Sequence, residues 1–180
     1  MKPLIAAAAM ALSVLEPAGA AEPDLQITRA GTRAVNVAPA QNFTGNVTVE
    51  MLYTPVGTER ASAGTVRFSP GARTAWHSHP LGQTLIVTAG IGRIQRWGGP
   101  VEEIRVGDVV HIPPNTKHWH GAAPDSAMTH IAITEALNGT TAEWMERVTD
   151  AQYGATPARS SLRPSPDASR SPPPNEMTAC

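Results

Sequence analysis

Apolar and polar residues alternate along Asn46–Tyr53, which places on one face Val47, Val49, Met51 and Tyr53. A period of two is typical of a β-strand with one buried face. A second strand is predicted over Ser62–Ser69, after which Pro70 and Gly71 turn the chain. The region before these strands, residues 21–44, is polar and irregular, with one candidate edge segment at Arg33–Ala38.

Further strands follow at short intervals. Thr84–Thr88 is a continuous apolar and β-branched run, as expected for a strand buried on both faces, and Gly90-Ile91-Gly92 predicts a turn after it. The later predicted strands are Arg93–Trp97, Val101–Arg105, Val109–Ile112, Thr116–Gly121 and Met128–Glu135. Short strands separated by Gly and Pro turns indicate an all-β sandwich or barrel.

One C-terminal helix is predicted after the last strand. Thr140 to Glu143 has the pattern of a capping box, and Trp144 and Val148 would form an apolar face before Gly154. This helix would pack outside the barrel or against a partner subunit. Residues 155–180 are rich in Pro, Ser, Arg and Ala, cannot bury enough apolar surface to order themselves, and are predicted to be a disordered tail.

The first twenty residues contain a lysine, a short apolar run from Leu4 to Leu15, and Ala18-Gly19-Ala20. This is the pattern of a secretory signal peptide, and the run is too short to span a bilayer. The alternative is a retained helix or membrane anchor. The expected organisation is a signal peptide (1–20), an arm (21–44), one domain (45–154) and the tail (155–180), in a periplasmic or secreted protein with no membrane contact after cleavage.

The composition narrows the range of possible functions. The chain has 180 residues, of which 41% are hydrophobic and 16% charged, so it can bury a core. The net charge of -1 and the absence of a clustered basic face speak against nucleic acid as a partner. Cys180 is the only cysteine, so the domain has no internal disulfide.

All six histidines lie between His77 and His130. His77 and His79 are two residues apart and therefore leave one face of an extended strand together. Gln83 follows with a side-chain oxygen, and His118 comes from a separate strand. Three imidazoles and one oxygen with open positions favour a catalytic transition-metal site over a closed structural zinc site.

Other polar residues complete the candidate site. His120 shares a strand face with His118 and is either a general base or a residue that orients a ligand. His130 is either a second polar contact for substrate or a core histidine. Further candidates for the substrate pocket are Val66, Thr74 and Thr134. His111 is interpreted as structural or surface, and Trp76 and Trp119, which flank ligands on opposite strand faces, are predicted to pack.

These residues resemble the two motifs of the cupin family. The first motif is matched by Gly71, His77, His79, Gln83 in place of the usual Glu, and Gly90. The second is matched by Gly107, Pro113, Asn115 in place of the usual Gly, and His118, whereas Ala122 stands where Asn is usual. Asn tolerates the left-handed conformation for which Gly is chosen. The resemblance implies a double-stranded β-barrel of the jelly-roll type.

Residues 35–153, including HPLGQTLIVTAG and KHWHGAAP, are similar to small bacterial manganese cupins described as hydroxynitrile lyases. That similarity implies a metal-dependent lyase acting on cyanohydrins, with Mn(II) and with Fe, Co, Ni or Zn as other metals that the ligands accept. In those lyases the position of Thr134 tends to carry a larger polar residue. A homodimer is expected by family analogy, with the Asn46–Tyr53 strand and the Trp144 helix offering apolar surface.

Two other functions stay open at this point. A cupin dioxygenase would use iron or another redox metal at the same ligands. A non-catalytic module would bind a metal or a small ligand without turnover. Gln83 in place of Glu removes one negative charge beside the metal and thereby favours Lewis-acid chemistry over high oxidation states.

Overall fold

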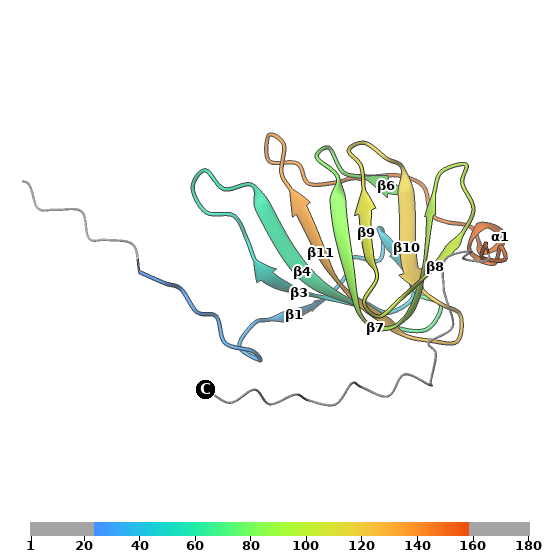
Figure 1. Ribbon diagram of the computed structural model, residues 1–180, viewed down its shortest axis with the longest axis horizontal. Coiled ribbons are helices and arrows are strands. Elements are labelled where there is room, and N and C mark those ends of the chain that lie inside the picture. The colour runs from blue at the N-terminus through green and yellow to red at the C-terminus, as the bar shows by residue number, and fades with distance from the viewer. Residues whose placement is uncertain (1–23, 159–180) are drawn as a thin grey trace, which may run out of the picture.

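The computed structural model describes residues 24–158, so the predicted signal peptide and nearly all of the predicted tail lie outside the described residues. The chain folds into antiparallel strands that curl into a barrel, with one short helix at the C-terminal end (Figure 1). The all-β prediction is therefore confirmed. The strands are β1 (Val35–Val37), β2 (Phe43–Thr44), β3 (Val47–Tyr53), β4 (Ala61–Phe68), β5 (Arg73–Thr74), β6 (His77–Ser78), β7 (Gln83–Arg96), β8 (Glu102–Arg105), β9 (Val109–Ile112), β10 (His118–Ala122), β11 (Met128–Glu135) and β12 (Glu143–Trp144).

Two sheets form the barrel. Sheet A has the strand order β1-β3-β4-β11-β7-β9, and sheet B the order β2-β5-β10-β7-β8. The short strand β6 pairs with β10 on one side and β12 on the other. Strand β7 belongs to both sheets, because its first half pairs with β11 and its second half with β8 and β10.

The continuity of β7 corrects one prediction. Gly90-Ile91-Gly92 does not turn the chain back but lies inside one strand of 14 residues. Gly90 has a φ of 72°, and a Cβ there would lie 1.8 Å from the carbonyl oxygen of Ala127. Glycine is therefore required where β7 leaves sheet A for sheet B, because no side chain fits against the neighbouring backbone.

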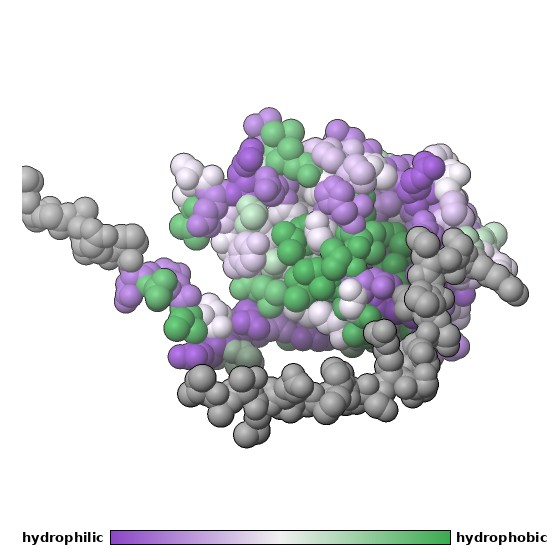
Figure 2. All heavy atoms as spheres, viewed as in Figure 1, coloured by the Kyte–Doolittle hydropathy of each residue, from purple (hydrophilic) through white to green (hydrophobic). Residues whose placement is uncertain are grey.

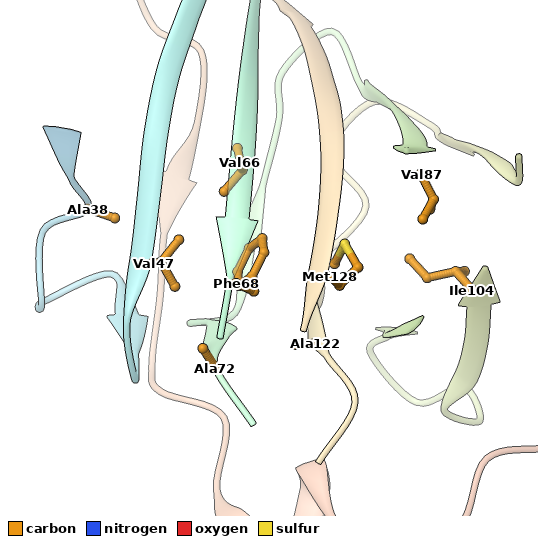
Figure 3. Packing of buried hydrophobic residues seen from close by; sticks show 9 residues of the cluster. All are labelled: Ala38, Val47, Val66, Phe68, Ala72, Val87, Ile104, Ala122 and Met128. Atoms are coloured by element: carbon orange, nitrogen blue, oxygen red, sulfur yellow. The ribbon is translucent and has the colours of Figure 1, made fainter. Parts of the chain in front are cut away.

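The core lies between the two sheets. Its buried members come from both sheets and include Val66 and Phe68 of β4, Val87 of β7 and Met128 of β11 (Figure 3). This core borders the candidate site directly, because Val66 lines its cavity and the Phe68 ring centre lies 5.9 Å from that of His120 and 5.6 Å from that of His130.

A second apolar cluster lies on the outer face of sheet B. Trp76 and Trp119 are almost completely buried there, together with Val101, Val148 and Tyr153. The prediction that both tryptophans pack away from the histidines is confirmed. The C-terminal part of the chain supplies Val148 and Tyr153 and therefore covers this sheet from outside.

The C-terminal helix is shorter and begins later than predicted. Residues Thr140 to Val148 are not helical, and Trp144 lies in β12. The helix α1 spans only Asp150–Tyr153, and its capping box is formed by Thr149 and Gln152. The Thr140 pattern failed because the strand ladder with β6 satisfies the backbone of this segment instead.

The outer face of sheet A carries an apolar stripe. Register places Ile86 beside both Val109 and Ile131, and Figure 2 shows apolar residues gathered in the middle of the visible face. The predicted homodimer stays a prediction, and the Trp144 helix that was expected to contribute to its surface does not form. Among residues 24–158 no helix is long and apolar enough to cross a membrane.

Candidate metal centre

Three histidines meet at one end of the barrel. His77 of β6 and His118 of β10 are direct partners across two antiparallel strands, and His79 follows just after β6. One ring nitrogen from each lies within 4.8 Å of the others, and all three residues are buried. The structure therefore brings together the three histidines that the sequence spacing singled out.

Each of these rings is held through Nδ1. The acceptor is the carbonyl oxygen of Ala75 for His77 (3.0 Å), of Thr116 for His118 (2.8 Å) and of Thr141 for His79 (2.6 Å). A carbonyl oxygen only accepts, so each Nδ1 carries the proton and each Nε2 keeps a free lone pair. Such contacts fix the tautomer of histidines that bind a metal through Nε2.

The surroundings of these Nε2 atoms fit a cation. His79 Nε2 is buried and has no hydrogen-bond partner. His118 Nε2 lies 3.3 Å from Gln83 Oε1, and with the proton on His118 Nδ1 both of these atoms are acceptors. A bound cation would satisfy both of these lone pairs at a buried site, so the donor set suits a transition metal.

Gln83 is placed by the turn that precedes it. Gly82 has a φ of 82°, and a Cβ at this residue would lie 2.6 Å from the carbonyl oxygen of Ile112. The chain can approach β9 this closely only with glycine, and β7 then begins at Gln83 with its side chain buried. The amide oxygen is thereby delivered beside His118.

Burial keeps the three imidazoles neutral. Desolvation is the main cause that lowers the pKa of His77 and of His79, and it lowers the pKa of His118 to about 4. The neighbouring histidine rings lower the pKa of His77 and His118 further, because two positive charges would repel one another. Neutral imidazole is the form that binds a metal, so the site is ready for one at neutral pH.

A second pair of histidines lies next to this cluster. His120 Nδ1 and His130 Nε2 are 3.3 Å apart, and both residues are buried. The backbone N–H of His120 donates to Thr74 Oγ1 at 3.1 Å. His120 Nε2 has no partner, so His120 can exchange one proton with a bound molecule and share another with His130.

His120 and His130 line a cavity of about 240 Å³. The sequence-predicted pocket residues Val66, Thr74 and Thr134 all line it, as do His77, His79 and Gln83. Thr134 lies 3.2 Å from Ser62 through their hydroxyl oxygens, which places a pair of hydroxyls on the wall. His118 is absent from the lining, and His111 is exposed on β9, in agreement with its interpretation as a surface residue.

The sequence did not reveal the aromatic wall of this cavity. Trp144 stacks on His77 with ring centres 4.7 Å apart and planes at 27°. Phe43 lies 5.4 Å from Trp144 and also lines the cavity, as do Met51 and Thr141. Trp144 and Val148 are four residues apart, which is the spacing of a helical face, so their pattern gave no signal for the extended segment that the structure has here.

Comparison with known proteins agrees with this architecture. Residues 64–134 match a cupin domain model. A relative from Granulicella tundricola, named (R)-mandelonitrile lyase, is 56% identical over 129 residues, which cover 72% of this chain and 98% of the relative.

The chain belongs to the cupin family.

Solved cupins have the same fold. A cupin-like protein from Thermotoga maritima is 47% identical, with a TM-score of 0.64, over 73% of this cupin and 97% of its own chain. A polyketide cyclase from Streptomyces resistomycificus has a TM-score of 0.59 over 73% of this cupin and 92% of its own chain, but it is only 16% identical and supports the fold alone.

Where the family motif usually has Gly, Asn115 has a φ of 58°, so it adopts the left-handed conformation expected of it.

Proposed function

We propose that this cupin is a metal-dependent lyase that cleaves and forms cyanohydrins. The observation that carries the proposal is the cavity in which the unpartnered His120 Nε2 lies beside three histidines suited to one metal. The 56% identity to a protein named (R)-mandelonitrile lyase supports the same reaction class.

The metal would be held by His77, His79 and His118, with the oxygen of Gln83 as a fourth donor. A bound divalent cation supplies Lewis acidity, which lowers the pKa of a substrate hydroxyl. All four donors are neutral, so they leave the positive charge of the ion undiminished. We propose Mn(II) as the metal, and the same donors accept Fe, Co, Ni or Zn.

His120 is proposed as the general base. Its Nε2 accepts the proton of the cyanohydrin hydroxyl, and the oxygen forms a carbonyl as the bond to the nitrile carbon breaks. The electron pair of that bond leaves with cyanide, which then takes the proton from His120. In the reverse direction His120 removes the proton of hydrogen cyanide, and the cyanide carbon attacks the carbonyl carbon of the aldehyde. His120 then gives that proton to the former carbonyl oxygen, which becomes the hydroxyl group.

His130 is proposed to keep His120 in the required tautomer. When His120 Nδ1 carries a proton and donates it to His130 Nε2, His120 Nε2 is free to act as a base. Burial lowers the pKa of His130 to about 4, so His130 is neutral and can accept at neutral pH. The role of His130 is therefore to orient and polarise His120.

The cavity wall favours a substrate with an apolar or aromatic group. Phe43 and Trp144 offer ring faces, and Val49 and Met51 add aliphatic surface. Aromatic rings pack on such faces in offset or edge arrangements. An aryl cyanohydrin such as mandelonitrile therefore suits the cavity, with the aldehyde benzaldehyde as its product.

The experiment that tests this function is mandelonitrile cleavage with and without oxygen. Manganese-loaded protein is expected to release benzaldehyde at the same rate in an anaerobic cell and in air, because no step consumes oxygen. Activity that requires oxygen would instead indicate a dioxygenase, and metal uptake with no turnover of cyanohydrins would contradict the lyase.

We also propose that the protein is exported to the periplasm or secreted, and that it forms a homodimer. The signal-peptide pattern of residues 1–20 supports export. The apolar stripe on the outer face of sheet A is a surface suited to a second copy.

A further inference from the structure

The C-terminal segment over residues 140–154, here called the strap, contacts the metal centre. We propose that docking of the strap and binding of the metal are thermodynamically linked, with Arg73 and Arg147 as positioning residues that act on the metal through His79. The inference rests on the metal site of the proposed function, and it does not depend on which reaction the site performs.

The link starts at His79. His77 and His118 are each oriented by a carbonyl only two residues away on their own segment of chain. His79 Nδ1 is instead 2.6 Å from the carbonyl oxygen of Thr141, a residue 62 positions later in the strap. The orientation of one of the three proposed histidine ligands therefore depends on a distant segment being in place.

The strap also covers a second proposed ligand. Trp144 pairs with His77 across the β12–β6 ladder and stacks on its ring. Next to Trp144, the backbone N–H of Met145 donates to the carbonyl oxygen of Trp76 at 2.8 Å. The backbone N–H of Trp76 in turn donates to the carbonyl oxygen of Glu146 at 2.9 Å. If the strap moved away from the barrel, His79 Nδ1 would lose the carbonyl oxygen of Thr141 as its acceptor. At the same time the ring of His77 would lose its stacking contact with Trp144.

Two arginines anchor the strap away from the cavity. Arg147 donates to the carbonyls of Phe43 and Ala40 and to Thr44 Oγ1. Arg73, whose side chain is 8% exposed, donates to Val148 O at 3.3 Å and to an Asp150 carboxylate oxygen at 2.6 Å. Neither arginine lines the cavity, and both hold the strap through side-chain contacts that lie outside it.

The end of the strap is held by stacking. The Tyr153 ring lies near two guanidinium groups, 4.5 Å from Arg73 and 5.5 Å from Arg93. The Tyr153 hydroxyl donates to the carbonyl of Ala122 at 2.8 Å, and Arg93 donates to the Tyr153 carbonyl at 3.0 Å. The strap is thus fixed at both ends, with the His79 contact near its start.

The linkage predicts that docking of the strap strengthens metal binding and that a bound metal stabilises the docked strap. Loss of a partner that orients a ligand typically weakens metal binding 10–100-fold. Because coupling between two binding equilibria is reciprocal, a bound metal should make opening of the strap rarer by the same factor.

Hydrogen exchange of the full-length protein, with and without saturating Mn(II), measures this factor. The amides of Met145 and Trp76 report on the strap, and the amides of β11 at the centre of sheet A report on global unfolding. In metal-free protein the strap amides are expected to exchange faster than those of β11. Added Mn(II) is expected to slow the strap amides about 10–100-fold.

Arg147→Ala and Arg60→Ala form a matched pair of variants. Arg60 is an exposed arginine whose side chain pairs with Glu135, a residue outside the strap. Arg147→Ala should speed exchange at Met145 without speeding exchange in β11, and Mn(II) should still slow it. Arg60→Ala should leave exchange at Met145 unchanged.

The outcomes separate the linkage from the metal site. If Mn(II) slows β11 amides but leaves Met145 and Trp76 unchanged, the linkage is wrong while the metal site stands. If Mn(II) changes no amide, both are wrong. If Arg147→Ala speeds the strap and β11 equally, the strap does not open on its own, and the linkage is again overturned.

Discussion

His120→Ala is expected to bind the metal normally and to lower the rate of mandelonitrile cleavage about 10²–10⁴-fold, the usual contribution of a general base. The three histidines of the metal cluster do not include His120, so its removal leaves every proposed ligand in place. The cavity would lose the unpartnered nitrogen that takes the hydroxyl proton. The checks are steady-state rates of benzaldehyde release and metal content by elemental mass spectrometry.

His111→Ala is the matched control, because His111 is exposed on β9 and lies outside the cavity. This variant should keep both metal and activity. Loss of metal in His120→Ala would show that His120 is a ligand, and full activity in that variant would place the base elsewhere.

The metal-free protein is expected to lose stability steeply as the pH falls below about 6.5. The pKa values of His118 and His130 are lowered by burial to about 4, whereas an unfolded chain binds these protons near pH 6.5. Above pH 6.5 both states are neutral, and the stability is fully present. Between pH 6.5 and 4 the unfolded state binds more protons, so the free energy of unfolding decreases as pH falls.

The size of this effect is large for a small domain. Each of these two histidines contributes about 2 kcal/mol between pH 7.5 and pH 5, so together they remove on the order of 4 kcal/mol. The pKa values of His77, His79 and His120 are shifted in the same direction and add to the loss. A domain of this kind has about 5–15 kcal/mol to lose.

Urea unfolding of metal-free protein at pH 7.5 and at pH 5 measures the loss directly. The same comparison for His130→Asn, which removes one of the buried titrating groups, should show a smaller difference between the two pH values. Equal free energies of unfolding at both pH values in the unmodified protein would contradict the buried, neutral state of these histidines.

The grouping of the histidines could be predicted because it depends on local spacing. His77 and His79 are two residues apart, so an extended segment directs both side chains to the same side, and the second motif brings His118 from a neighbouring strand. The structure places their ligand atoms within 4.8 Å. Their role as metal ligands, and that of Gln83, stays a prediction that the geometry supports.

The part played by the strap could not be predicted from the sequence. Thr141 acts through its backbone carbonyl, which every residue has, so its identity carries no signal. The sequence predicts a helix at Trp144 because Thr140 and Glu143 match a capping box, although Thr149 and Gln152 match one as well. Pairing of β12 with β6 decides between them, and this contact spans more than sixty residues of sequence.

The continuity of strand β7 could not be predicted from the local sequence either. Glycine at positions 90 and 92 is a turn signal in a local reading, and Gly90 does have a positive φ. The chain nevertheless continues, because β11 pairs with the residues before Gly90 and β8 with the residues after it. Tertiary pairing thus determined whether a local bend became a turn.

A manganese titration of metal-stripped protein tests the central claim most directly, with benzaldehyde release from mandelonitrile measured without oxygen after each addition. The account predicts that the rate rises in proportion to bound manganese and levels off at one ion per chain. Stripped protein as active as loaded protein, or one manganese bound per chain with no benzaldehyde released, would contradict it.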